Sequence, residues 1–174
     1  MSASIFAPPR DLLDFQPERV ALTGYRCAMA GYEFGDASSW DALWDALAND
    51  GGLQCACHVM GSLQFFVRSL RSTLEGAGNY YPQNCRRVCR VEGLVLALLA
   101  AHQNSDDPTR AFTMQHLLGE LAPVHGELID AAAAAWARAM RDCDLCLMPV
   151  PLNVVQSIVS CGQCSLNNAT RLDA

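Results

Sequence analysis

The stretch Leu94-Val95-Leu96-Ala97-Leu98-Leu99-Ala100-Ala101 decides the fold class, because it is apolar at every position. A helix that is apolar on all sides is buried by its neighbours and does not face solvent along one side. Pro82 is a suitable first-turn residue for such a helix, which we expect to run from Pro82 to about His102. The sequence therefore predicts a central, buried helix around which the rest of the chain packs.

Further amphipathic helices are expected on both sides of this segment. Trp40, Leu43 and Leu47 have helical spacing between capping residues at 36–39 and a stop at Gly51-Gly52. The same kind of pattern predicts helices at about residues 57–75, 106–121 and 124–142. These segments make the chain mainly helical.

Two segments are harder to assign from the pattern. Residues 19–35 are rich in glycine and aromatic residues without a clear period, so we assign them to coil, whereas residues 152–160 fit either a helix or a strand. We predict an all-α, single-domain bundle of five or six helices over residues 1–174, with loose ends at 1–10 and 167–174. A metal-stabilised C-terminal segment would complete this bundle.

The composition excludes several function classes. Hydrophobic residues make up 51% of the chain and the net charge is −6, which is typical of a globular protein and disfavours nucleic-acid binding. All 12 basic residues are arginine, so no Schiff-base lysine and no lysine-containing phosphate loop is present. No acid–base or nucleophile motif stands out, and we do not expect an enzyme.

The compartment determines what clustered cysteines do. The first residues show no signal-peptide pattern, and the longest apolar stretch, residues 94–101, is far shorter than the ~20 residues that cross a membrane. We therefore expect a cytoplasmic protein that does not insert into membranes. In that reducing environment clustered cysteines bind metal or perform redox chemistry more often than they form lasting disulfides.

Nine cysteines are the strongest chemical signal in the chain, and eight of them form four close pairs. The pairs are Cys55/Cys57, Cys85/Cys89, Cys143/Cys146 and Cys161/Cys164, with Cys27 outside them. The two C-terminal pairs have two residues inside each pair and fourteen between the pairs, which resembles the spacing of zinc knuckles. We predict a four-thiolate zinc site there; four buried structural thiols and a redox pair are the alternatives.

The two N-terminal pairs give a second, less defined candidate. Cys85 and Cys89 would lie one turn apart on a helix, and Cys55, Cys57 and His58 would lie near the start of another. The helix N-terminus would favour the thiolates of Cys55 and Cys57, and Arg86, Arg87 and Arg90 would lower the pKa of the thiols further. Metal binding, redox-active thiols and purely structural cysteines all remain open for this group.

Zinc is the expected ion, with an iron–sulfur cluster or copper as the alternatives for the same thiols. We expect a metal-binding helical protein that acts as an adaptor, regulator or assembly factor for a protein partner. The alternative is a protein whose cysteines are themselves the activity: an iron–sulfur or thiol-based redox protein, or a Cu(I) or other metal chaperone.

Overall fold

The computed structural model describes residues 12–74 and 80–169, and within them the side chains of all but residues 50, 51 and 161–169. The described part contains six α-helices, two short 3-10 helices and no strand, which confirms the all-α prediction. The elements in chain order are η1 Leu12–Asp14, α1 Gln16–Phe34, α2 Ala37–Thr73, α3 Arg90–Asn104, α4 Asp107–Leu118, η2 Gly119–Leu121, α5 Ala122–Arg141 and α6 Leu152–Ala169.

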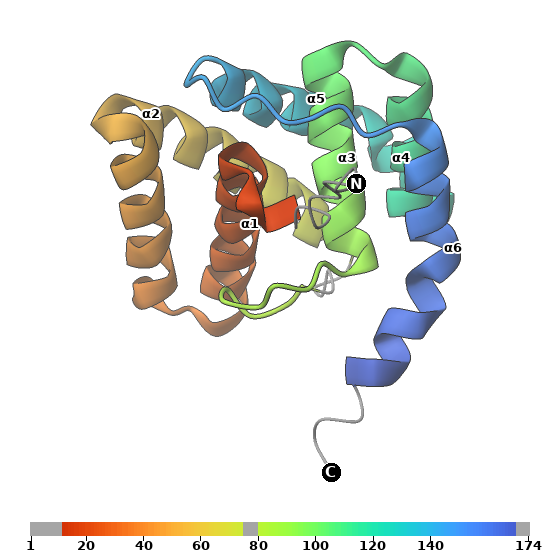
Figure 1. The fold of residues 1–174 in the computed structure, drawn as a ribbon, viewed down its shortest axis with the longest axis horizontal. Helices are drawn as coiled ribbons and strands as arrows, with labels where there is room; N and C mark the ends of the chain where they lie inside the picture. Colours follow the sequence, from red (N-terminus) through yellow and green to blue (C-terminus); the bar gives the residue numbers. More distant parts are fainter. Residues whose placement is uncertain (1–11, 75–79, 170–174) are drawn as a thin grey trace, which may run out of the picture.

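The predicted central helix is confirmed. Helix α3 stands in the middle of the structure, with α1 and α2 on one side and α4 and α6 on the other (Figure 1). It packs against α4, α5 and α6, while α2 packs against α1 and α5. Every residue from Leu94 to Ala101 is buried, so burial of this all-apolar helix organises the core.

Helix α2 bends at the expected stop signal. Asp36 caps its start by accepting a 2.9 Å hydrogen bond from the Ser38 N–H, as the sequence predicts. Gly52 interrupts the helix with φ +80° and ψ 168°, a conformation that glycine adopts without steric cost. The residues after Gly52 therefore run in a new direction (Figure 1). Cys55, three residues on, bonds to Cys143 just after the end of α5.

The coil assignment for residues 19–35 is wrong, because residues 19–34 lie in α1 and Gly35 is its C-cap. Two glycines obscure its helical period, and both lie where α2 comes close. A Cβ on Gly31 would lie 2.6 Å from the Trp40 ring, and a Cβ on Gly24 would lie 3.1 Å from Leu63. These positions carry glycine because large side chains of α2 fill the space, so the apolar stripe of α1 is incomplete in its own sequence.

The predicted start of the central helix at Pro82 is also wrong, because α3 begins at Arg90 and residues 80–89 form a loop. A buried ion pair holds this loop: Arg26 Nε donates to Glu92 Oε1 at 2.7 Å, and both side chains are at most 2% exposed. The Arg26 guanidinium also donates to the Cys85 carbonyl at 2.6 Å and to the Arg87 carbonyl. In exchange, Glu92 accepts the Tyr81 and Cys89 N–H groups. A buried ion pair needs such additional hydrogen bonds. The backbone N–H and carbonyl groups of this loop therefore bond to Arg26 and Glu92 and do not form helical hydrogen bonds.

The open choice at residues 152–160 resolves to helix, since they form the first half of α6. Residues 143–151, which we call the strap, connect α5 to α6 and cross one end of α3 (Figure 1). None of the helices in the described residues is long and apolar enough to span a membrane.

Candidate redox site at the Cys55–Cys143 disulfide

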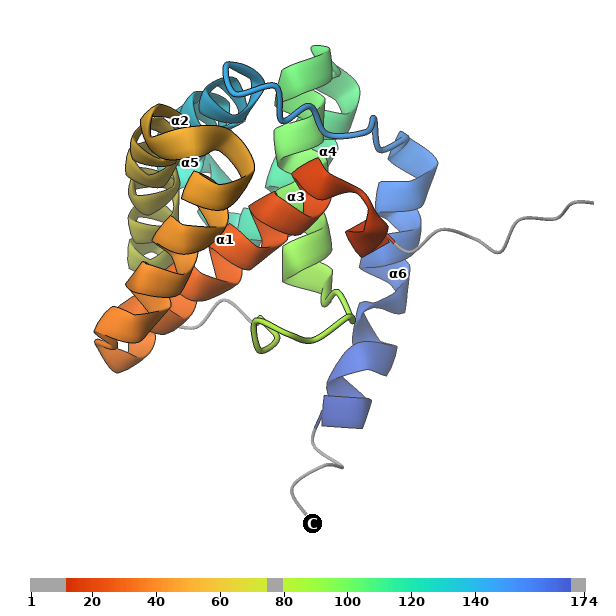
Figure 2. The same ribbon diagram turned by 60° about the vertical axis from the view of Figure 1, so that its left-hand side comes forward.

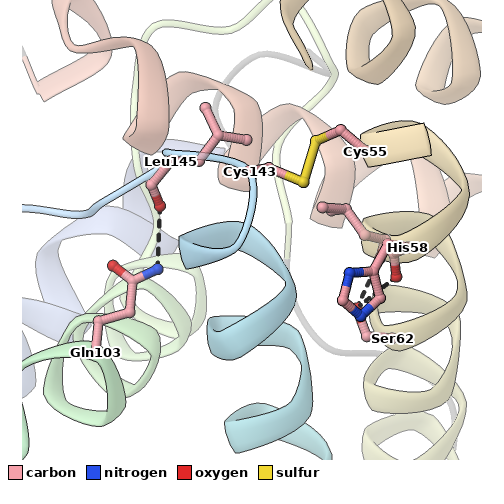
Figure 3. The surroundings of a disulfide bond; sticks show 7 residues. Cys55, His58, Ser62, Gln103, Cys143 and Leu145 are labelled. Carbon is pink, nitrogen blue, oxygen red and sulfur yellow. Dashed lines mark hydrogen bonds between the residues drawn. A yellow bond between two sulfur atoms is a disulfide. The ribbon is translucent and has the colours of Figure 1, made fainter. Parts of the chain in front are cut away.

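The structure joins two cysteines that the sequence places in different groups. Cys55 of α2 and Cys143 of the strap form a disulfide, with their Cα atoms 5.7 Å apart and 88 positions apart in sequence (Figure 3). This Cα separation lies within the range that disulfides require. The bond therefore ties α2 to the end of α5.

The kink in α2 positions Cys55. Three residues after Gly52, Cys55 faces the core beside Ala56 and is 7% exposed. Cys57 lies two residues further along the helix, on the other face, and is exposed. His58 lies one turn after Cys55 (Figure 3). One buried sulfur and one accessible sulfur thus belong to the same turn of α2.

The end of α5 positions Cys143. Asp144 adopts the left-handed conformation with φ +59°, which aspartate tolerates better than most residues. The Asp144 N–H donates to the Arg141 carbonyl at 3.0 Å, and the Leu145 N–H donates to the Met140 carbonyl at 2.9 Å. This pair of bonds is the Schellman pattern that ends helices. It turns the chain sharply, so that half-buried Cys143 faces α2.

Gln103 of α3 holds the next part of the strap. Its side-chain Nε2 donates to the Leu145 and Ala137 carbonyls, both at 3.0 Å, and its Oε1 accepts the Leu147 N–H at 2.7 Å (Figure 3 shows the bond to Leu145). Leu145 and Leu147 are buried, while Cys146 between them is exposed. The strap is thus an extended segment, fixed at one point by the disulfide and at the next by Gln103.

Two other cysteines are poorly suited to nucleophilic chemistry. Burial raises the pKa of the Cys27 thiol in α1 to about 11. Burial, together with the Glu92 carboxylate, raises the pKa of Cys89 to about 12. The expectation that nearby arginines would lower the pKa of Cys89 is therefore wrong, because desolvation of the thiol dominates. Cys89 acts as the N-cap of α3, and its side chain accepts the Glu92 N–H.

The second predicted metal group is not assembled in the structure. Cys85 is half-buried in the loop before α3 and Cys89 caps α3, so the prediction that both lie on one helix face is wrong. Cys55 bonds to Cys143 and does not join Cys85 and Cys89. Among the residues that the structure describes, no three histidine, cysteine, aspartate or glutamate side chains come together as a metal-binding group.

The predicted zinc set is described only in part. Cys143 and Cys146 belong to the strap, but the side chains of Cys161 and Cys164 lie outside the described residues. Whether the four thiols meet therefore stays a prediction. Cys143 sulfur is in the disulfide, and a disulfide sulfur is not the thiolate that zinc requires.

A polar cluster of three helices lies apart from the sulfur atoms. His102 Nε2 of α3 lies 2.9 Å from Asp130 Oδ1 of α5, and Asp130 Oδ2 accepts a 3.2 Å hydrogen bond from Arg110 of α4. Burial lowers the pKa of His102, although Asp130 opposes this shift. Asp130 therefore connects His102 of α3 to Arg110 of α4, so His102 has a partner on α5 in addition to the capping position that its place near the end of α3 suggests.

The residues that position this site gave no clear sequence signal. Gln103 lies next to His102 near the end of a helix, and Asp144 lies between Cys143 and Cys146. The only sequence signal for Gln103 is that it follows the apolar run closely, two positions after Ala101, which is compatible with a buried hydrogen-bonding role.

Comparison of the chain with protein-family models, with curated protein sequences and with solved structures finds no match.

Proposed function

We propose that this protein is a thiol–disulfide redox protein in which the Cys55–Cys143 bond is reversibly reduced. The observation that carries the proposal is that each bonded cysteine has an exposed thiol close to it in sequence: Cys57 beside Cys55, and Cys146 beside Cys143. Redox-active cysteines are often adjacent to such a resolving thiol. The chemistry was expected as an alternative to metal binding, and the paired sulfurs now favour it.

The reductant is a dithiol, and a protein dithiol is the partner that we propose. One of its thiolates attacks Cys143 Sγ, because Cys143 is half-buried whereas Cys55 is 7% exposed. The bond between the two sulfurs breaks, and Cys55 leaves as a thiolate. The second thiolate of the reductant then attacks the reductant's own sulfur in the mixed disulfide and releases Cys143. The reductant becomes a disulfide, and this protein gains two electrons and two protons.

Reduction has a structural consequence at the strap. The disulfide fixes the strap at Cys143, only two residues before Leu145, whose carbonyl binds Gln103. Without the bond, the strap keeps the Gln103 contacts but loses its covalent link to α2. We propose that this change at the strap is the signal that reduction produces, with α2 and α3 serving as the rigid frame.

A redox titration tests the proposal. The protein is equilibrated in glutathione buffers of graded potential, the free thiols are alkylated, and the fraction of reduced Cys143 is measured by mass spectrometry. We expect one two-electron transition between roughly −200 and −300 mV. A bond that persists in more reducing buffers would identify a structural disulfide and refute the redox function.

The kinetics of the same reaction test the role of the neighbouring thiol. Cys146 can attack Cys143 Sγ, release Cys55 and form an exposed Cys143–Cys146 disulfide that glutathione reaches easily. The variant Cys146→Ser is therefore expected to slow reduction by glutathione. Cys27→Ser is the matched control, because Cys27 is buried and has a raised pKa. Equal rates for wild type and Cys146→Ser would remove Cys146 from the mechanism.

Zinc binding by Cys143, Cys146, Cys161 and Cys164 remains a second proposal, supported by their spacing. Since Cys143 is common to the zinc set and the disulfide, the two states exclude each other. Elemental analysis of the oxidised and reduced protein after incubation with zinc decides the matter. About one zinc per chain in the reduced protein alone supports this proposal, whereas no zinc in either state rejects it.

A further inference from the structure

A pocket of about 550 Å³ lies between the start of α1, helix α3, the strap and α6. In Figure 2 the start of α1 passes across α3, and residues of both helices line the pocket. The walls of the pocket are mostly apolar and include Phe15, Leu96, Val150, Val154 and Ile158. Both the volume and the apolar lining are typical of sites that bind small molecules.

One buried carboxylate faces this apolar pocket. Glu18 of α1 lines it and is only 3% exposed. Its Oε1 accepts a 2.7 Å hydrogen bond from the Met148 N–H of the strap, while its buried Oε2 has no hydrogen-bond partner in the described part of the chain. A buried carboxylate oxygen without a donor is costly, and native proteins rarely leave one so. The missing donor is therefore a specific requirement of this pocket.

A second unpartnered atom borders the same space. Arg90 lines the pocket, and its buried Nε has no partner among the described residues, although its Nη2 donates to the His116 carbonyl at 3.3 Å. Arg90 is half-buried, whereas Glu18 is almost fully buried. A charge is less screened by water when it is more deeply buried. Glu18 should therefore influence the charge of a bound ligand more strongly than Arg90 does.

We infer that this pocket binds an apolar small molecule that carries an amine, with the amine donating to Glu18 Oε2. The hydrocarbon body of the molecule lies against the apolar walls, where its burial supplies the non-directional part of the affinity. The charge-assisted hydrogen bond to Glu18 fixes its orientation and selects amines over carboxylates. This binding activity is separate from the thiol chemistry proposed above, since it uses none of the sulfur atoms of the disulfide.

The test compares octylamine with octanoate, two probes of equal chain length and opposite charge, by calorimetric titration of the full chain. We expect octylamine to bind at least about tenfold more tightly, as a hydrogen bond to a charged group gives. The variant Glu18→Gln should lose this preference, and Glu120→Gln, at an exposed glutamate, should keep it. Unchanged preference in Glu18→Gln, or tighter binding of octanoate to wild type, would overturn the inference.

A second readout needs no variant. Because Met148 N–H donates to Glu18, its amide resonance in the wild-type protein should shift on adding octylamine and stay in place with octanoate. An unmoved Met148 resonance at saturating octylamine would contradict the assigned site. Failure of octylamine to bind the full chain, followed by binding once residues 1–11 are removed, would show instead that the chain's own N-terminal segment occupies the pocket and would overturn the proposal.

Discussion

Replacing Cys143 with serine should remove the covalent link between α2 and the strap and destabilise the protein. The bond joins residues 88 positions apart, so it closes a long loop in the unfolded chain. The loop-entropy relation for a loop of this size gives about 4.5 kcal/mol of unfolding free energy. For a chain of this length, the melting temperature should fall by roughly 9–18 °C.

The assay is urea unfolding followed by tryptophan fluorescence, with and without a reductant. Trp136 is suited to this measurement, since it is 1% exposed and its ring centroid lies 5.4 Å from that of Phe66 in the core. Wild type should lose about 4.5 kcal/mol on reduction. Cys143→Ser should begin at the lower value and should not respond to the reductant.

The matched control is Cys146→Ser, which changes an exposed cysteine three residues away that is outside the disulfide. It should keep the stability of the oxidised wild type and, once its disulfide is fully reduced, should lose as much stability as the wild type does. Our reasoning would be refuted if Cys143→Ser were as stable as the oxidised wild type. It would be refuted equally if Cys143→Ser lost stability on reduction as the wild type does.

Three further predictions concern buried polar groups. Gln103→Leu leaves the Leu145 carbonyl and the Leu147 N–H of the strap without partners and removes an additional bond to the Ala137 carbonyl, so it should lower the unfolding free energy by about 3 kcal/mol in urea titrations. Gln115→Leu, at an exposed glutamine, should cost far less. Arg26→Met isolates the buried Glu92 carboxylate and should cost about 3–5 kcal/mol of unfolding free energy in the same assay. An Arg26→Met variant as stable as wild type would contradict the ion-pair account. Because burial lowers the pKa of folded His102, the unfolded chain binds its proton more readily, so stability is lost as the pH falls below the unfolded value near 6.5 and the loss is complete below the folded pKa. Urea titrations at about pH 7.5 and pH 5.5 should therefore show a smaller decrease for His102→Gln than for wild type, and equal decreases would reject this source of pH dependence.

The helices were predictable where one segment carries its own signal. Leu94–Ala101 is apolar all round, and Gly52 interrupts a helix from its own position in the chain. The helix over residues 19–34 was not predictable in this way, because the reason for a glycine at position 31 is the Trp40 ring of the next helix. Local periodicity identifies a helix whose own large side chains form the apolar stripe. It does not identify a helix such as α1, in which glycines leave room for the large side chains of a neighbouring helix.

The site was less predictable than the fold for the same physical reason. Spacing along the chain suggested that Cys55 would act with Cys57, and Cys143 with Cys146. The observed pair instead depends on a bend at Gly52 and a left-handed turn at Asp144, which together bring two distant backbones within 5.7 Å. Tertiary packing determines this distance between the two Cα atoms, and the spacing of cysteines along the sequence does not predict it.

The connectivity of the sulfur atoms, before and after reduction, tests the central claim most directly. Asp144 lies between Cys143 and Cys146, so a protease that cuts before aspartate separates these two cysteines, and Cys57→Ser removes the ambiguity at α2. Mass spectrometry of the unreduced digest should find the Cys55 peptide bonded to the Cys143 peptide, and a mild dithiol should release both. A Cys143 bonded only to Cys146, or thiols at Cys55 and Cys143 after full air oxidation, would contradict the account.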